Sequence, residues 1–208
     1  MGQPADLVAA ARAAGVTERR LLDAIAAVPR AAFVPSQLAE HAYDDIPLPI
    51  PHDQVTTQPS LVARMVAALE LAPADRVLEI GTGFGWQTAL LARLAERVWS
   101  IERWEDIAAT ARAHLEGYDN VTVVVGDGSR GLPEHAPYDA ILVAAAFTEV
   151  PPPLAEQLAE SGRLVQPIGP GGADDVFLFE KRDGVLVRRR FLTGAYFVRL
   201  YGEHGFRA

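Results

Sequence analysis

The chain of 208 residues contains no cysteine. This absence excludes disulfide bonds, zinc–thiolate sites, iron–sulfur clusters and cysteine nucleophiles. Long apolar runs are also missing, since none approaches the ~20 residues that a bilayer-spanning helix needs. The N-terminus lacks a basic start followed by a dense apolar stretch, so no signal peptide is predicted. We therefore expect a cytoplasmic protein without a membrane partner.

Basic residues are fewer than acidic ones: the chain has 19 Lys and Arg residues and 27 Asp and Glu residues, which gives a formal net charge of −8. Phosphate contacts need clustered Lys and Arg, so this balance argues against a nucleic-acid partner. The one short basic run, at 188–190, is interpreted as a solvent-exposed strand face. Half of the residues are hydrophobic, which is ordinary for a globular protein with a sizeable core.

The first 58 residues differ in pattern from the remainder. Short helices are predicted at 5–14 and 18–28, where apolar residues recur at helical spacing. Prolines then recur between residues 28 and 59, which predicts an irregular, extended segment. A loop of that length inside a compact protein is usually functional. We expect residues 1–58 and 59–208 to be two distinct parts of the chain.

From Pro59 onward, helical and strand patterns alternate. A helix is predicted over 60–71, and later helices at about 85–95, 104–116 and 152–160. Strands are predicted at 76–81, 97–102, 120–127, 138–146 and 162–169, followed by a hairpin around Asp183-Gly184. This alternation predicts an α/β fold with a doubly wound, mostly parallel sheet of seven strands, covered on both faces.

Three successive strands end in residues that suit a nucleoside ligand. Gly81, Gly83 and Gly85 follow the first strand and allow the backbone to turn tightly beside a ligand. Glu102 ends the second strand, where an acidic side chain can accept hydrogen bonds from ribose hydroxyls. Asp127 ends the third strand and can receive an adenine amino group. Each signal is weak alone, but together they indicate a nucleoside site.

The nucleoside is predicted to be S-adenosyl-L-methionine. A dinucleotide fingerprint needs glycine where this chain has Trp86, because bulk there obstructs the approach of a pyrophosphate. S-adenosyl-L-methionine carries no phosphate, so the requirement disappears. Glu79, just before the glycine-rich loop, can meet the cationic amino-acid end of this ligand directly or through water.

Several motifs resemble the protein-L-isoaspartate O-methyltransferase family: LEIGTGFGWQTALLARL, AYDDIPLPI, GDGSRGLPEHAPYDAILVAAAFTEVPPPLAEQL and GRLVQPIG, within residues 28–182. The resemblance implies a Rossmann-like methyltransferase domain at 59–208 and an N-terminal segment, 1–58, that closes over the substrate. It implies methylation of the α-carboxylate of isoaspartyl residues in proteins or peptides. The resulting ester collapses to a succinimide, which permits protein repair. The cofactor contacts it implies are Glu79, Gly81, Thr82, Gly83, Glu102, Asp127 and Gly128.

The loop at 50–59 departs from the family pattern I-G-x-G-Q-T-I-S-Q-P. Pro51 and Asp53 replace its two glycines, and Val55 replaces its threonine. Thr57 stands where the family carries a serine hydroxyl linked to activity, so a hydroxyl is retained. A further departure places Arg199 where the family has proline.

A carboxylate with an ordinary pKa of ~4 is already a nucleophile at neutral pH, so no general base is required. We interpret Thr57 as the catalytic residue that hydrogen-bonds the reacting carboxylate, with Gln54 and Thr56 binding substrate. The alternative for both threonines is capping of the following helix. His52 has no partner identifiable from the sequence, and Trp104 is interpreted as packing rather than as part of an adenine pocket.

Three functions stay open at this point. The first is an isoaspartyl methyltransferase of the repair type. The second is a carboxyl methyltransferase that acts on an aspartate in a dedicated peptide or protein, which the altered loop at 51–57 favours considering. The third is a non-catalytic protein that binds S-adenosyl-L-methionine. No metal is expected in any of them.

Overall fold

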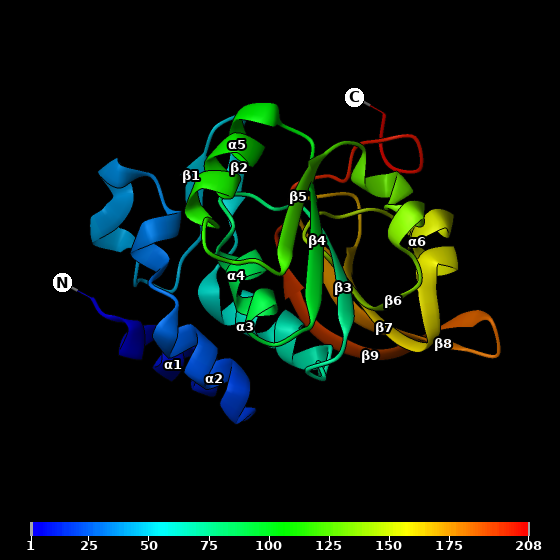
Figure 1. Ribbon diagram of the computed structural model, residues 1–208, viewed down its shortest axis with the longest axis horizontal. Coiled ribbons are helices and arrows are strands. Elements are labelled where there is room, and N and C mark those ends of the chain that lie inside the picture. The colour runs from blue at the N-terminus through cyan, green and yellow to red at the C-terminus, as the bar shows by residue number, and fades with distance from the viewer. Residues whose placement is uncertain (1, 208) are drawn as a thin grey trace.

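A single sheet of seven strands forms the centre of the computed structural model, which describes residues 2–207 (Figure 1). In spatial order its strands are β5 (Val121–Val125), β4 (Arg97–Glu102), β3 (Arg76–Ile80), β6 (Tyr138–Val143), β7 (Leu158–Ile168), β8 (Asp174–Arg182) and β9 (Val185–Ala195). The first five strands in this order pair in parallel, and the last two pairings are antiparallel. The predicted doubly wound, mostly parallel fold is confirmed.

Helices cover both faces of the sheet, as Figure 1 shows. On one face, a buried cluster joins β-strand side chains to five helices, namely α1 (Pro4–Ala13), α2 (Arg19–Ala27), α3 (Pro59–Ala68), α4 (Trp86–Ala92) and α5 (Glu105–His114). On the other face, α6 (Pro152–Gln157) contributes Leu154 to a second cluster. Successive strand residues alternate between the two, so Val77 lies in the first cluster and Leu78 in the second.

The N-terminal segment shares a core with the residues that follow it. Leu21 and Ile25 of α2 lie in the same buried cluster as Val66 of α3 and Leu90 of α4. The boundary at residue 58 therefore stays a prediction about the roles of the two parts, because packing runs across it without a break.

A buried arginine organises the proline-rich part of this segment, which contains the short helices η1 (Arg30–Phe33) and η2 (Ser36–His41) and the hairpin of β1 (Leu48–Ile50) and β2 (Gln54–Thr56). Arg30 is 0% exposed. Its guanidinium donates to the carbonyls of Ala42, Asp44 and Ile46 at 3.1–3.2 Å and to the Thr56 hydroxyl at 3.0 Å. Burial lowers the pKa of Arg30 to about 10. One buried side chain thus connects the carbonyls of residues 42, 44 and 46 to the β1–β2 hairpin.

Some predicted boundaries were wrong. The helix predicted over 152–160 ends at Gln157, and β7 begins at Leu158, because Leu158 pairs with Tyr138 across an irregularity in the β6–β7 register. This tertiary pairing overrides the local helical preference of Leu-Ala-Glu. The strand predicted over 138–146 ends at Val143. The small β1–β2 hairpin was not predicted, whereas the β8–β9 hairpin around Asp183-Gly184 is confirmed.

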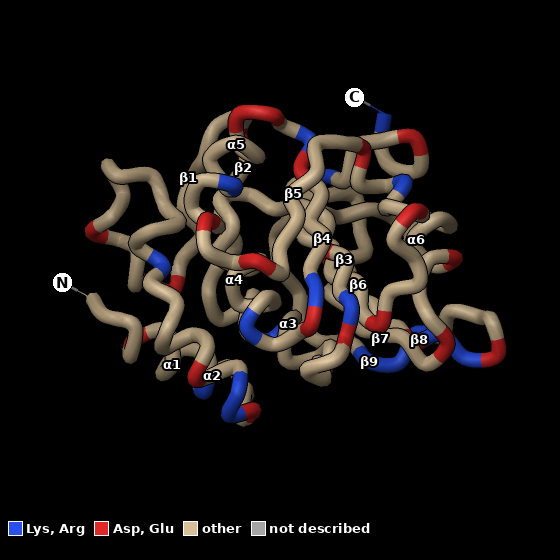
Figure 2. Tube along the Cα trace, viewed as in Figure 1, with Lys and Arg blue, Asp and Glu red and all other residues tan. Residues whose placement is uncertain are grey.

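Charged residues of both signs are dispersed along the chain trace, as Figure 2 shows. The basic run at 188–190 lies exposed on β9, as expected for a strand face. Arg188 lies over the ring of Phe177, and Arg189 pairs with Glu180 at 3.2 Å. Among residues 2–207, no helix combines the length and apolar character needed to cross a bilayer.

Candidate active site

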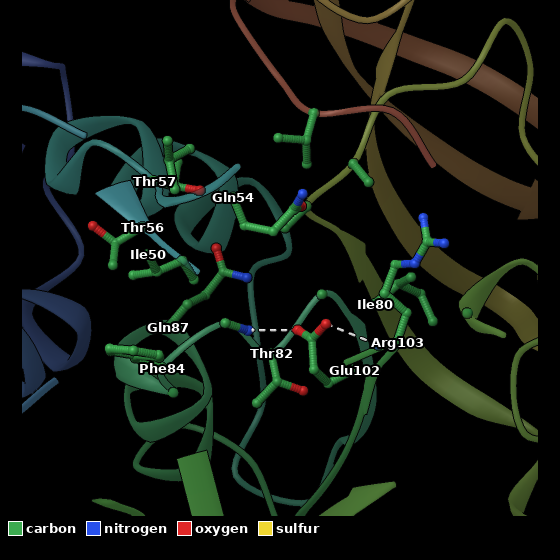
Figure 3. A pocket seen from close by; sticks show the side chains of 18 of the residues that line it. Ile50, Gln54, Thr56, Thr57, Ile80, Thr82, Phe84, Gln87, Glu102 and Arg103 are labelled. Atoms are coloured by element: carbon green, nitrogen blue, oxygen red, sulfur yellow. Dashed lines mark hydrogen bonds between the residues drawn. The ribbon is translucent and has the colours of Figure 1, made fainter. Parts of the chain in front are cut away.

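A cavity lies at the carboxyl ends of β3 and β4, the edge where open α/β sheets bind ligands (Figure 3). Many parts of the chain form its wall: the β1–β2 hairpin, the loop after β3, the start of α4, the end of β4, residues that follow β5 and β6, and the segment after β9, together with Arg30, Phe33 and Val62. Segments far apart in the sequence therefore meet around one space. The lining includes Gln54, Thr56, Thr57, Gly81, Thr82, Gly83, Gln87, Glu102, Gly128 and Tyr201.

The loop after β3 turns sharply beside the cavity. Gly81 adopts a φ of 94°, which a residue with a Cβ rarely takes. Thr82 turns inward, with its hydroxyl 2.6 Å from that of Ser100. Gly128 follows β5 and packs so closely that a Cβ there would collide with Ile80. Gly81, Gly83 and Gly128 all line the cavity, and their predicted contacts with a cofactor stay a prediction.

Glu102 is held in place by the backbone around it. Its Oε2 accepts a hydrogen bond from the Gly83 N–H at 3.0 Å, and its Oε1 accepts from the Arg103 and Trp104 N–H groups at 2.8 and 3.2 Å. The side chain is 6% exposed, and burial raises its pKa although these donors oppose the shift. A fixed carboxylate at this edge can accept hydrogen bonds from hydroxyl groups, as expected for a ribose contact.

Glu79 lies behind the cavity wall and is 0% exposed. Its carboxylate accepts hydrogen bonds from Gln87 Nε2 at 2.8 Å and from the hydroxyls of Thr88 and Ser100 at 2.5 Å each. Burial raises its pKa to about 7, against the effect of these three donors. The residues that line the cavity do not include Glu79, and its predicted ligand contact stays a prediction.

Asp127 is engaged by the C-terminal segment. Its Oδ1 accepts from the Ser129 N–H at 2.9 Å and the Ser129 hydroxyl at 2.6 Å, while its Oδ2 accepts from the Glu203 N–H at 2.8 Å. Partial burial alone raises the pKa of Asp127, but these hydrogen bonds outweigh it and lower the pKa below its ordinary value. Gly202 packs directly against this carboxylate, where a Cβ would collide. The predicted adenine contact of Asp127 stays a prediction, since the carboxylate is bound to its own chain here.

The β1–β2 hairpin carries the predicted substrate residues. Gln54, Thr56 and Thr57 all line the cavity. The Thr56 hydroxyl is used by the fold, because it accepts from Arg30 and from the Leu48 N–H at 3.2 Å. The Gln54 amide donates to the His52 carbonyl at 2.8 Å.

Helix capping does not account for the two threonines. The N-cap of α3 is Gln58. The Ser60 N–H at the start of this helix is bound by Asp45 Oδ1 at 2.8 Å, and Asp45 Oδ2 accepts from the Gln58 side chain at 3.0 Å. A distant aspartate therefore does the capping that the sequence alternative assigned to Thr56 and Thr57.

Sequence reasoning missed two features of the site. His52 does have partners, because its ring stacks on Trp104 and its Nε2 lies 2.9 Å from Asp106. Gln87 also lines the cavity and was not singled out. Its signal was available, since it is a polar residue in the first turn of the helix that follows the glycine-rich loop.

The remaining aromatic and basic candidates are tied into the fold. Trp86 is buried and donates from its indole to the Val28 carbonyl at 3.3 Å. Arg199 lines the cavity and donates to the Pro170 carbonyl at 2.8 Å. Within residues 2–207, no group of three or more His, Asp or Glu side chains is arranged to hold a metal ion.

Several known proteins are similar to this chain in sequence. The family model for protein-L-isoaspartate(D-aspartate) O-methyltransferase matches residues 3–205. A protein-L-isoaspartate O-methyltransferase of Roseiflexus castenholzii is 52% identical over 192 residues, covering 91% of this chain and 88% of that protein. One of Koribacter versatilis is 48% identical over 197 residues, covering 94% and 88%.

Solved structures give the same result. A protein-L-isoaspartate O-methyltransferase with 32% identity superimposes with a TM-score of 0.86, covering 98% of this chain and 67% of that one. A Plasmodium falciparum protein described as a putative member, in complex with S-adenosyl-L-homocysteine, shares the fold at 22% identity, with a TM-score of 0.82 and coverage of 97% and 99%. From the match over nearly its whole length, this chain belongs to the protein-L-isoaspartate(D-aspartate) O-methyltransferase family.

Proposed function

We propose that the protein transfers a methyl group from S-adenosyl-L-methionine to the α-carboxylate of isoaspartyl residues in proteins or peptides. One observation carries the proposal: the cavity shares a wall with a second groove. Val55, Thr57, Ala144 and Val198 line both spaces. A methyl donor in one space and an acceptor in the other would therefore meet beside the Thr57 hydroxyl.

The residues of the cavity fit the proposed cofactor. Glu102 offers a fixed carboxylate for ribose hydroxyls, and Ile80, Ile101 and Leu200 offer apolar walls for a purine ring. Gln87 adds a buried carbonyl oxygen that, among residues 2–207, has no hydrogen-bond partner. This set of acceptors and apolar surfaces suits a nucleoside with a cationic end.

The second groove fits an extended peptide. It runs along α3 and the end of β9, past Gln58, Leu61 and Arg64. Tyr196, at its border, is 83% exposed and offers an aromatic surface to a ligand. Its lining mixes polar, basic and apolar residues, which suits an enzyme that acts on damaged sites in many proteins.

Methyl transfer to a carboxylate requires the protein to position its two ligands and to enclose them. The cofactor supplies an electrophilic methyl group, and the C–S electron pair goes to sulfur as the new C–O bond forms. The acceptor carboxylate has an ordinary pKa of ~4 and needs no general base. Thr57 donates its hydroxyl proton in a hydrogen bond that orients the reacting oxygen. The hairpin excludes water, and alignment supplies much of the acceleration.

Methyl transfer to two matched peptides tests the proposal. The peptides differ only in carrying isoaspartate or aspartate at one position. The labelled methyl ester is hydrolysed in base, and the methanol that it releases is counted. We expect turnover on the isoaspartyl peptide alone. Turnover on the aspartyl peptide, or binding of S-adenosyl-L-homocysteine without transfer to either peptide, would contradict the proposed acceptor.

A further inference from the structure

Gln87 presents an unpartnered carbonyl oxygen to the cavity. The residue lies in the first turn of α4, is 8% exposed and lines the cavity (Figure 3). Its Nε2 is used, because it donates to Glu79 Oε1 at 2.8 Å. Its Oε1 is buried and, within residues 2–207, has no hydrogen-bond partner. Buried polar atoms in native proteins are almost always paired, so a donor is missing from this position.

The contact with Glu79 fixes the orientation of the Gln87 amide. Glu79 is fully buried, and its Oε2 already accepts from the hydroxyls of Thr88 and Ser100. When Glu79 is ionised, a flipped amide would set the Gln87 carbonyl oxygen against Glu79 Oε1, with two acceptors in contact. Gln87 Nε2 therefore stays hydrogen-bonded to Glu79, and Gln87 Oε1 stays on the cavity side. The carboxylate behind the amide also polarises it and strengthens the outward acceptor.

The cationic amino-acid end of the cofactor can supply the donor that Gln87 Oε1 lacks. Glu102 marks the ribose position at one side of the glycine-rich loop, while Gln87 lies at the other side, towards Gln54 and Thr57 in Figure 3. With the ribose at Glu102 and the transferred methyl group facing Thr57, the rest of the cofactor extends from Glu102 towards Thr57. Its amino-acid end therefore lies on the Gln87 side.

We propose that Gln87 Oε1 accepts a hydrogen bond from the α-ammonium of bound S-adenosyl-L-methionine. Glu79 then acts as a positioning residue, through Gln87, and touches no ligand atom. This inference rests on the proposed function, because it takes S-adenosyl-L-methionine as the ligand. It departs from the sequence interpretation by assigning the amino-acid end to a neutral amide.

Binding of two ligands by calorimetry tests the inference. One is S-adenosyl-L-homocysteine, and the other is the same molecule lacking only its amino group. In the wild type we expect loss of the amino group to weaken binding roughly tenfold, the usual effect of a hydrogen bond to a charged group. In Gln87→Met we expect weaker binding of S-adenosyl-L-homocysteine and little further loss when the amino group is removed.

Two further variants separate this role from a structural one. Thr88→Val removes another donor to Glu79 from a residue outside the cavity lining, so the preference for the amino group should match that of the wild type. Exchanging the pair, Glu79→Gln together with Gln87→Glu, keeps an acceptor on the cavity side and a donor–acceptor contact behind it, so the preference should be kept. The inference is overturned if Gln87→Met retains the wild-type preference, or if the exchanged pair and Thr88→Val lose it. A wild type that fails to bind S-adenosyl-L-homocysteine would instead contradict the proposed function.

Discussion

The imidazole of His52 lies flat on the indole of Trp104, with the ring centroids 3.9 Å apart and 5° between the planes. The same imidazole places Nε2 2.9 Å from both carboxylate oxygens of Asp106. The hydrogen bond from His52 is the main reason that the pKa of Asp106 falls below its ordinary value. These contacts connect the tip of the β1–β2 hairpin to the start of α5.

Removing the His52 ring should loosen this connection and weaken cofactor binding. We expect His52→Ala to raise the Kd for S-adenosyl-L-homocysteine by about two- to tenfold, the range expected for one aromatic pair. His52→Phe keeps the stack without the Asp106 contact and serves as the matched control. Calorimetry would distinguish them. Equal affinity of His52→Ala and the wild type would show that the contact does not hold the hairpin over the ligand.

The Thr57 hydroxyl should matter to turnover more than to binding. We expect Thr57→Ala to lower kcat on an isoaspartyl peptide by about ten- to a hundredfold, because an orienting hydrogen bond to a charged oxygen is lost. Thr57→Ser keeps the hydroxyl and should retain most of the activity. Initial rates at saturating cofactor measure both. Unchanged turnover in the alanine variant would remove Thr57 from the catalytic role.

Glu102 should recognise the ribose. We expect Glu102→Ala to weaken binding of S-adenosyl-L-homocysteine by about ten- to a hundredfold, the effect of losing hydrogen bonds to a carboxylate. An analogue without ribose hydroxyls provides the cross-check, since it should bind the variant and the wild type with similar, weak affinity. If the variant still prefers the hydroxylated ligand as strongly as the wild type does, the contact lies elsewhere.

Glu79 should make stability fall as pH rises. Its pKa is about 7 when folded against an ordinary value of 4.5, so between these values the folded state holds a proton that the unfolded state has released. Raising the pH therefore favours unfolding. We expect the free energy of unfolding of the wild type to fall by roughly 2–3 kcal/mol more than that of Glu79→Gln between about pH 5 and about pH 8. Urea denaturation of both proteins across this range measures the difference, and parallel pH profiles would contradict the assignment.

The sheet and the glycine-rich edge could be predicted because they depend on local pattern. The runs at 76–81 and 97–102 are rich in apolar residues and have clear ends in the sequence. Because the two strands are parallel, their carboxyl ends lie at the same edge of the sheet, which brings Gly81 and Glu102 together there. The β1–β2 hairpin was missed because its strands are three residues long and surrounded by proline. Such short strands leave no periodicity to detect.

The rest of the site depends on contacts between distant residues. His52 meets Asp106 across 54 positions, and the Glu203 N–H meets Asp127 across 76. No spacing rule relates such pairs, because tertiary packing brings them together. Arg30 shows the same limit: a lone arginine in a proline-rich stretch gives no sign in sequence that its guanidinium is fully enclosed.

The four hydrogen bonds of Arg30 also restrict how the site can admit its ligands. They tie residues 42, 44 and 46 to Thr56, so bending the segment between these residues and the hairpin would strand a buried cation and its carbonyl partners. The tip of the hairpin carries no such anchor and relies on the half-exposed His52. We expect ligands to enter through local breathing of residues 51–54, with the surrounding scaffold staying still.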